Sequence, residues 1–113
     1  MIVADDDVKI TVYLKDKNNL LANATVSIPT IEFGYVTIKD FLIWKSNNLN
    51  ERLQEYINIT PPTKQFYGRY HPGVFFEKKD CWYKLEEKIY DAYIKVKNKY
   101  HSNGKLDIET VDI

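Results

Sequence analysis

The chain lacks the features that signal a disulfide framework or a membrane span. It has one cysteine in 113 residues, so no internal disulfide can form, and a reducing compartment is expected. No apolar run exceeds four residues, whereas a transmembrane helix needs about 20. The chain begins MIVADDD, which has neither the basic nor the long apolar part of a secretion signal. These absences predict a cytoplasmic protein.

The chain also lacks the residue patterns of enzymes and metal sites. There is no glycine-rich phosphate loop, and Cys81 has no patterned partner in either histidine, His71 or His101. A catalytic cysteine needs a base within reach and a third group that orients this base, and a zinc site needs closely spaced ligands. The adjacent Glu86 and Glu87 fit the solvated face of a helix. We therefore expect no enzymatic activity, no metal and no cofactor.

Formal net charge is zero, with 16 basic and 16 acidic residues, but the charge is unevenly distributed. Six acidic residues and one lysine lie in the two ends, which leaves 15 basic (16 − 1) and 10 acidic (16 − 6) residues between positions 8 and 101. We divide the chain into a flexible acidic arm (1–7), one domain (8–101) and an acidic C-terminal tail (102–113). A body with a net charge of +5 suits a polyanionic partner, although unrelated domains reach the same value.

Aromatic residues are abundant, with nine tyrosines, five phenylalanines and two tryptophans. One small core needs fewer rings than this. Tyrosine and tryptophan are favoured at interfaces, where one part of the ring is buried and its polar group still finds a partner. Some of these rings are therefore expected at an interface with a protein or another ligand.

Alternation of apolar and polar residues predicts a hairpin near the N-terminus. Residues 8–14 and 20–28 both alternate with a period of two, so each strand turns one face toward a core. The polar segment 15–19 between them predicts a loop of about five residues, and Pro29 is expected to end the second strand. Alanines at the inward positions 22 and 24 indicate that a helix packs closely over the sheet.

A third strand is predicted over residues 31–38, where valine and isoleucine alternate with polar residues. Gly34 inside this segment indicates a bulge or a close approach of the backbone. Residues 41–44 are apolar without alternation. They either continue the third strand past Lys39 and Asp40 or begin a new one.

The next segment has two readings and leads into the last strand. Residues 49–55 form either one helical turn or a long hairpin loop. Residues 56–60 then form a short strand rich in β-branched side chains. Pro61 and Pro62 end this strand, because proline donates no backbone hydrogen bond.

From Asp80 onward the apolar period changes to three and four residues. One stripe of a helix collects Trp82, Leu85, Ile89, Ala92, Tyr93, Val96 and Tyr100. Asp80 is expected to cap the N-terminus of this helix, and Asn103 with Gly104 to end it. About 20 residues give a rod of roughly 30 Å, long enough to cross a four-stranded sheet. The predicted fold class is α+β, with an antiparallel sheet of four to five strands followed by one long C-terminal amphipathic helix.

Residues 64–79 are the strongest functional candidate. Cations are interleaved there with aromatic rings, namely Lys64, Arg69, Lys78 and Lys79 with Phe66, Tyr67, Tyr70, Phe75 and Phe76. Such cations can follow a phosphate backbone while bases stack on the rings. We assign phosphate contacts to these four cations, and base stacking or shaping of the loop to Tyr67 and Tyr70. The alternative is an ordered loop, with a short strand at residues 74–77, that its aromatic residues hold against the sheet.

The order of these parts resembles the SpoVG family (stage V sporulation protein G, a septation regulator). The resemblance covers residues 8–100, and its carriers are ATVSI at 24–28, VTIKDFLIWKS at 36–46, INITPPTK at 57–64 and LEEKIYDAYIK at 85–95. The chain departs from the family pattern at residues 47–55, where it has an insertion. It also has a thinner basic run after Pro62.

The resemblance implies a small homodimer, assembled through its sheet, that binds DNA or RNA and acts as a regulator of the septation or sporulation type. By position, Lys64 matches a basic residue of the family, whereas Arg69, Lys78 and Lys79 rest on the local pattern alone. A second hypothesis keeps the fold and makes the chain a protein-interaction adaptor that binds no nucleic acid. Binding by such an adaptor would depend little on salt and would survive the loss of these cations.

Overall fold

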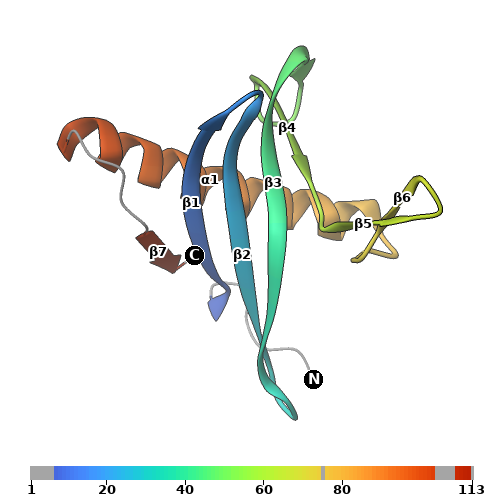
Figure 1. Ribbon diagram of the computed structural model, residues 1–113. Helices are drawn as coiled ribbons and strands as arrows, with labels where there is room; N and C mark the ends of the chain where they lie inside the picture. The colour runs from blue at the N-terminus through green and yellow to red at the C-terminus, as the bar shows by residue number, and fades with distance from the viewer. Residues whose placement is uncertain (1–6, 75, 104–108, 113) are drawn as a thin grey trace.

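A five-stranded antiparallel sheet is crossed on one face by a single long helix (Figure 1). The computed structural model describes residues 7–74, 76–103 and 109–112. In chain order the elements are β1 (Lys9–Lys17), β2 (Leu20–Thr30), β3 (Gly34–Asn50), β4 (Glu55–Thr60), β5 (Thr63–Phe66), β6 (Arg69–Pro72), α1 (Lys79–Asn103) and β7 (Glu109–Asp112). The strand order is β4-β3-β2-β1-β7, and β5 pairs with β6 in a separate two-stranded sheet. The predicted α+β fold is confirmed.

The core lies between the inner face of the large sheet and one stripe of α1. The sheet contributes alternate residues, as its period of two predicts: Ile10, Val12, Ala22, Ala24, Val26, Phe41 and Ile43. The predicted helical stripe contributes Leu85, Ile89, Ala92, Tyr93 and Val96. At the start of the helix, Trp82 stacks on Phe41 with ring centroids 6.3 Å apart. Both inward alanines are fully buried, as expected beneath a helix.

The loop between β1 and β2 is shorter than predicted. β1 continues to Lys17, which pairs with Leu20, so the loop holds only Asn18 and Asn19. Asn18 has a φ of 57°, a left-handed conformation that asparagine tolerates better than most residues. The polar residues 15–17 therefore extend the strand, because this asparagine allows a tight turn.

β3 is one continuous strand, which decides between the two alternatives for residues 41–44. Lys39 and Asp40 form a β-bulge inside it, since together they lie opposite a single residue, Thr25. Asp40 has a φ of 72°, and its Oδ1 accepts a hydrogen bond of 3.4 Å from Asn23 Nδ2. The bulge absorbs the extra residue, and pairing with β2 resumes beyond it.

The turn between β2 and β3 differs from the prediction at both ends. β2 continues past Pro29, and the proline is tolerated because β1 pairs with β2 no further than Ser27. β3 begins at Gly34 rather than at residue 31. Gly34 has a φ of 67° and completes the turn. The glycine is therefore needed for the conformation of the turn, and it does not form a bulge within the strand.

Residues 50–55 close a hairpin whose loop makes one helical turn, so both readings of residues 49–55 hold in part. β3 extends to Asn50, which pairs with Glu55. The Gln54 N–H donates to the Asn50 carbonyl at 2.7 Å, and Gln54 has a φ of 57°. The loop is thus limited to residues 51–54, shorter than the long loop considered from the sequence. β4 ends at the two prolines, as predicted.

α1 begins two residues earlier than expected and ends at the predicted residue. The N–H groups of Cys81 and Trp82 donate to the Lys78 carbonyl at 3.1 and 3.5 Å, so Lys78 stands immediately before the first turn. Asp80 lies within that turn and does not precede it. Its negative charge still stabilises the helix, because it interacts favourably with the positive end of the helix dipole. The last helical residue is Asn103.

The interpretation of Glu86 as part of a solvated face is wrong. This side chain is 2% exposed, and its Oε1 accepts hydrogen bonds from Arg52 Nη2 at 2.7 Å and Nε at 3.0 Å. Asn50 Nδ2 donates to the other carboxylate oxygen at 3.3 Å, and the Arg52 guanidinium lies 3.8 Å from the ring centroid of Tyr83. These contacts fasten the β3–β4 turn to α1. Glu87 is exposed, as predicted.

The segment assigned to the acidic tail (102–113) contains a strand that the sequence analysis did not predict. β7 pairs antiparallel with β1 and forms one edge of the sheet. Residues 1–6 of the predicted acidic arm lie outside the described residues.

Candidate nucleic-acid interface

Residues 63–72 form a hairpin where the sequence predicts a loop. β5 and β6 pair over their whole length, and Tyr67 with Gly68 joins them. Both turn residues have a positive φ, 51° and 74°, as a type I′ turn requires. Glycine adopts this conformation readily, but a tyrosine does so rarely, so the paired strands hold Tyr67 in an uncommon conformation.

The hairpin is held at its base and extends away from the large sheet (Figure 1). The Gly73 N–H donates to the Pro62 carbonyl at 2.6 Å. The strand predicted at residues 74–77 does not form among the residues described there. Phe76 packs instead against Trp82, with ring centroids 5.7 Å apart. Because a two-stranded hairpin is marginally stable alone, these contacts help to fix its position.

Tyr67 and Arg69 are the predicted site residues that the hairpin presents to solvent. The Tyr67 side chain is 91% exposed at the tip, and Arg69 is exposed at the start of β6. Lys64 and Tyr70 occupy backbone positions in β5 and β6, and their side chains lie outside the described part of the structure. An exposed ring and an exposed guanidinium on the same hairpin can stack on a base and contact a phosphate.

Lys78 and Lys79 lie at the start of α1, apart from the hairpin tip. Both are exposed. They lie at the N-terminus of the helix, so their charges add to the positive end of the helix dipole. Glu77 and Asp80 offset part of this charge. The predicted site residues with described side chains thus fall into two groups, at the hairpin tip and at the helix start.

α1 leaves one face of the large sheet uncovered, which we call the open face (Figure 1). The site predicted from the sequence includes no residue of this face. The residues that alternate with the core positions there include Lys9, Thr11, Tyr13, Lys15, Asn23, Thr25, Ser27, Thr37, Trp44 and Asn58. A hollow of about 220 Å³ is lined there by Tyr13, Lys15 and Lys39, and also by Asp40. The signal was available, because the alternation that turns Ile10 and Val12 inward also places their polar neighbours outward.

Several contacts order the side chains of the open face. Lys9 Nζ lies 4.8 Å from the ring centroid of Tyr35, within the range of a cation–π interaction. Trp44 Nε1 donates to Thr60 Oγ1 at 3.2 Å. A face that combines lysines with ordered aromatic rings is a second surface on which a nucleic acid can be bound.

Searches for a metal site, for a membrane-spanning helix and for similar proteins add no functional assignment. Among the described residues, no group of three or more His, Cys, Asp or Glu side chains is placed to hold a metal ion. Within the same part of the chain, no helix has both the length and the apolar character needed to cross a membrane. Comparisons with protein-family profiles, curated proteins and solved structures found no match.

Proposed function

We propose that the chain is a cytoplasmic, homodimeric regulator that binds DNA or RNA, as its resemblance to the SpoVG family implies. The observation that carries the proposal is the β5–β6 hairpin, which projects Tyr67 and Arg69 into solvent. A cation beside a stacking ring is the combination that sequence-tolerant binding uses. Lys78 and Lys79 add phosphate contacts at the helix start.

The free edge of β3 supports dimerisation through the sheet. β4 pairs with β3 only beyond the bulge, from Leu42 onward, so the described part of the chain offers no strand to residues 34–41 on that side. Tyr35, Val36 and Thr37 favour a strand conformation. A long exposed edge is a template for another strand, and antiparallel pairing about a two-fold axis joins two sheets into one. Each subunit of such a dimer adds the net positive charge of its residues 8–101 to the same assembly.

Fluorescence anisotropy with labelled duplex DNA, single-stranded DNA and RNA tests the binding. We expect affinity to fall steeply between low and physiological salt, because cations that neutralise phosphates release counterions. The comparison of the three probes identifies the preferred nucleic acid. A folded protein that binds none of them in low salt overturns the proposal.

A double variant tests whether the hairpin is the contact surface. Lys64→Ala with Arg69→Ala should weaken binding to unrelated sequences alike and flatten the salt dependence. Lys17→Ala with Lys95→Ala removes the same charge elsewhere and is the matched control. Equal losses in the two double variants would remove the hairpin from the mechanism.

A protein-interaction adaptor is the second candidate, and exposed rings outside the hairpin favour it. Phe33 and Tyr56 are both well exposed. Aromatic side chains of this kind anchor protein interfaces. A protein partner would bind with little dependence on salt and would tolerate loss of Lys64 and Arg69, which separates the two candidates in the same titrations.

A further inference from the structure

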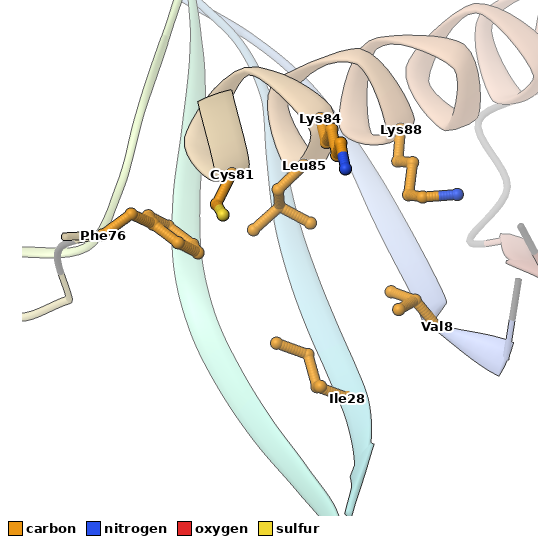
Figure 2. A pocket seen from close by; sticks show the side chains of 7 residues that line it. All are labelled: Val8, Ile28, Phe76, Cys81, Lys84, Leu85 and Lys88. Atoms are coloured by element: carbon orange, nitrogen blue, oxygen red, sulfur yellow. The ribbon is translucent and has the colours of Figure 1, made fainter. Parts of the chain in front are cut away.

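A groove of about 400 Å³ opens between α1 and the sheet, on the side of the β2–β3 turn (Figure 2). Its lining includes Val8 just before β1, Ile28 on β2, Phe76, and Cys81 and Leu85 on α1. Figure 2 shows these side chains turned toward the space between helix and sheet. The groove is within the size range of ligand pockets and has their apolar walls.

Two lysines line the groove on its helical side. Lys84 and Lys88 are one helical turn apart and lie beside Leu85. Among the described residues, neither groove lysine forms an ion pair with an acidic side chain. The groove therefore suits an occupant that is apolar and carries a negative charge.

The β2–β3 tip, residues 31–33, has this chemistry. Ile31 and Phe33 are 53% and 78% exposed, and they flank the exposed Glu32. Thr30 orders the tip, because its Oγ1 accepts a hydrogen bond of 3.0 Å from the Phe33 N–H and donates one of 2.7 Å to a carbonyl of the same turn. Exposed apolar side chains gathered at an ordered tip mark an interaction surface.

The tip is not placed to enter the groove of its own chain. Ile28 in the groove wall and Ile31 at the tip belong to the same hairpin, about 10 Å apart along it at the usual rise of a strand. β2 and β3 are paired up to the turn, so the hairpin carries the tip outward, beyond α1 (Figure 1). A second molecule is needed to bring the two surfaces together.

We propose that the groove receives the β2–β3 tip of a second copy of this chain. Ile31 and Phe33 pack against the apolar wall, and Glu32 faces Lys84 and Lys88. The contact forms twice, because a two-fold axis that sets one tip in its partner's groove sets the other likewise. This inference rests on the proposed homodimer, in which antiparallel β3 edges point each tip toward the helix of the partner.

A disulfide between two different chains tests the contact directly, because Cys81 is the only cysteine and lines the groove. One chain carries Phe33→Cys with Cys81→Ser, and the other chain is unsubstituted. Only a link between chains can then join position 33 to Cys81. Mild oxidation of the mixture should give this covalent heterodimer, since the bond forms only where the Cα atoms come within about 7 Å.

A matched control places the new thiol on another hairpin. Lys17→Cys with Cys81→Ser puts it beside the exposed β1–β2 turn. We expect a several-fold higher yield of heterodimer from the Phe33 variant, read by mass spectrometry as the peptide pair that joins position 33 to Cys81. Equal yields from the two variants overturn the inference.

Charge reversal tests the pairing of Glu32 with the groove. Glu32→Lys should weaken self-association about fivefold in sedimentation equilibrium, because it replaces attraction by repulsion at two partly exposed contacts. Adding Lys88→Glu to the same chain should restore most of the loss. Adding Lys95→Glu, on the exposed face of α1, should restore none. If the two additions act alike, Glu32 does not face the groove.

The two proposals can fail separately. Dimers in sedimentation that give no heterodimeric disulfide above the control overturn the tip contact and leave the sheet-mediated dimer in place. A protein that stays monomeric at the cross-linking concentration overturns both. Slower reaction of Cys81 with a thiol reagent as protein concentration rises supports the tip contact, because docking covers the groove. Protection of Cys81 by sodium laurate in a protein that stays monomeric assigns the groove to a small amphiphile and overturns the contact.

Discussion

The two ends of β3 differ in the contacts that their turns make with the rest of the chain. At one end the turn into β4 is fastened to α1 by Arg52 and the buried Glu86. At the other end the hairpin with β2 extends beyond the helix and exposes Ile31 and Phe33 (Figure 1). The first end satisfies its charges within the chain, whereas the second leaves apolar surface without a described partner. One strand thus contributes stability at one end and an interaction surface at the other.

Loss of the fastening should have the largest effect. Arg52→Ala leaves Glu86 buried without its cation, which should lower the free energy of unfolding by about 3 kcal/mol. This is the low end of the usual range, because Arg52 is 40% exposed. Phe33→Ser at the opposite end should change it by less than about 0.5 kcal/mol. Urea unfolding measures both variants, and similar losses would contradict the contrast between the ends.

The exposed tips of two hairpins should serve different partners. Tyr67→Asn removes the ring but suits the positive φ of the turn, so the β5–β6 hairpin persists. Nucleic-acid affinity should then fall about fivefold or more, since stacking of one base contributes roughly 1–3 kcal/mol. Phe33→Asn should weaken self-association and leave that affinity unchanged, with anisotropy read at concentrations that keep both variants dimeric. Loss of affinity in both variants would show that the tips do not act separately.

Gly34 and Gln54, the residues with positive φ in the two turns that flank β3, should differ less in their effect on the free energy of unfolding. Gly34→Ala adds a Cβ that meets no atom within 4 Å, so its cost of about 1 kcal/mol comes from backbone strain at a φ of 67°. Gln54→Gly relieves similar strain but loses the hydrogen bond from Nε2 to the Glu51 carbonyl and loosens the unfolded chain. Its net effect should stay below about 0.5 kcal/mol. Thermal unfolding tests the difference, and equal destabilisation would refute it.

Alkaline pH should act on the fastened side of the sheet. Burial raises the pKa of Tyr93, and Tyr90 and Glu55 raise it further. Burial also raises the pKa of Tyr90, with Glu55 and Asp91 adding to the effect. Both folded pKa values lie above the ordinary 10.0, so the stability they contribute is fully present below pH 10. It is lost as pH rises through the folded values, because the unfolded chain releases these protons first.

Tyr93→Phe tests this pH dependence. The free energy of unfolding should decline less steeply above pH 10 in this variant than in the unsubstituted protein, because one of the two phenolic protons no longer contributes. Tyr67→Phe changes a ring that is exposed at the hairpin tip and should leave the decline as it was. Parallel declines in all three proteins would place the effect on other groups.

Several features of the fold were predictable because they depend on neighbours in sequence. A period of two turned Ile10 and Val12 inward, and a period of three to four placed Leu85 and Ile89 on the buried stripe of α1. The end of β4 at two prolines was predictable for the same reason. The interleaved cations and rings of residues 64–79 likewise indicated a candidate site from composition alone.

The errors lie where a residue depends on a distant or unusual partner. Glu86 is buried because Arg52, 34 residues earlier, reaches it from a turn. The β5–β6 hairpin escaped prediction because Tyr67 with Gly68 lacks the asparagine or aspartate that usually marks such a turn. The bulge at Asp40 was also hidden, since the sequence does not state the register of β3 against β2.

Local patterns in the sequence were enough to predict which apolar residues face inward, where the helix lies along the chain and where cations alternate with rings. These properties follow from local periodicity and composition, which the geometry of a strand or a helix converts directly into faces. The packing of the chain in three dimensions sets which end of β3 is fastened to α1, which of its edges is free and where the groove with Lys84 and Lys88 opens. Such relations join segments far apart in the chain, and only the packing of helix against sheet sets their distances.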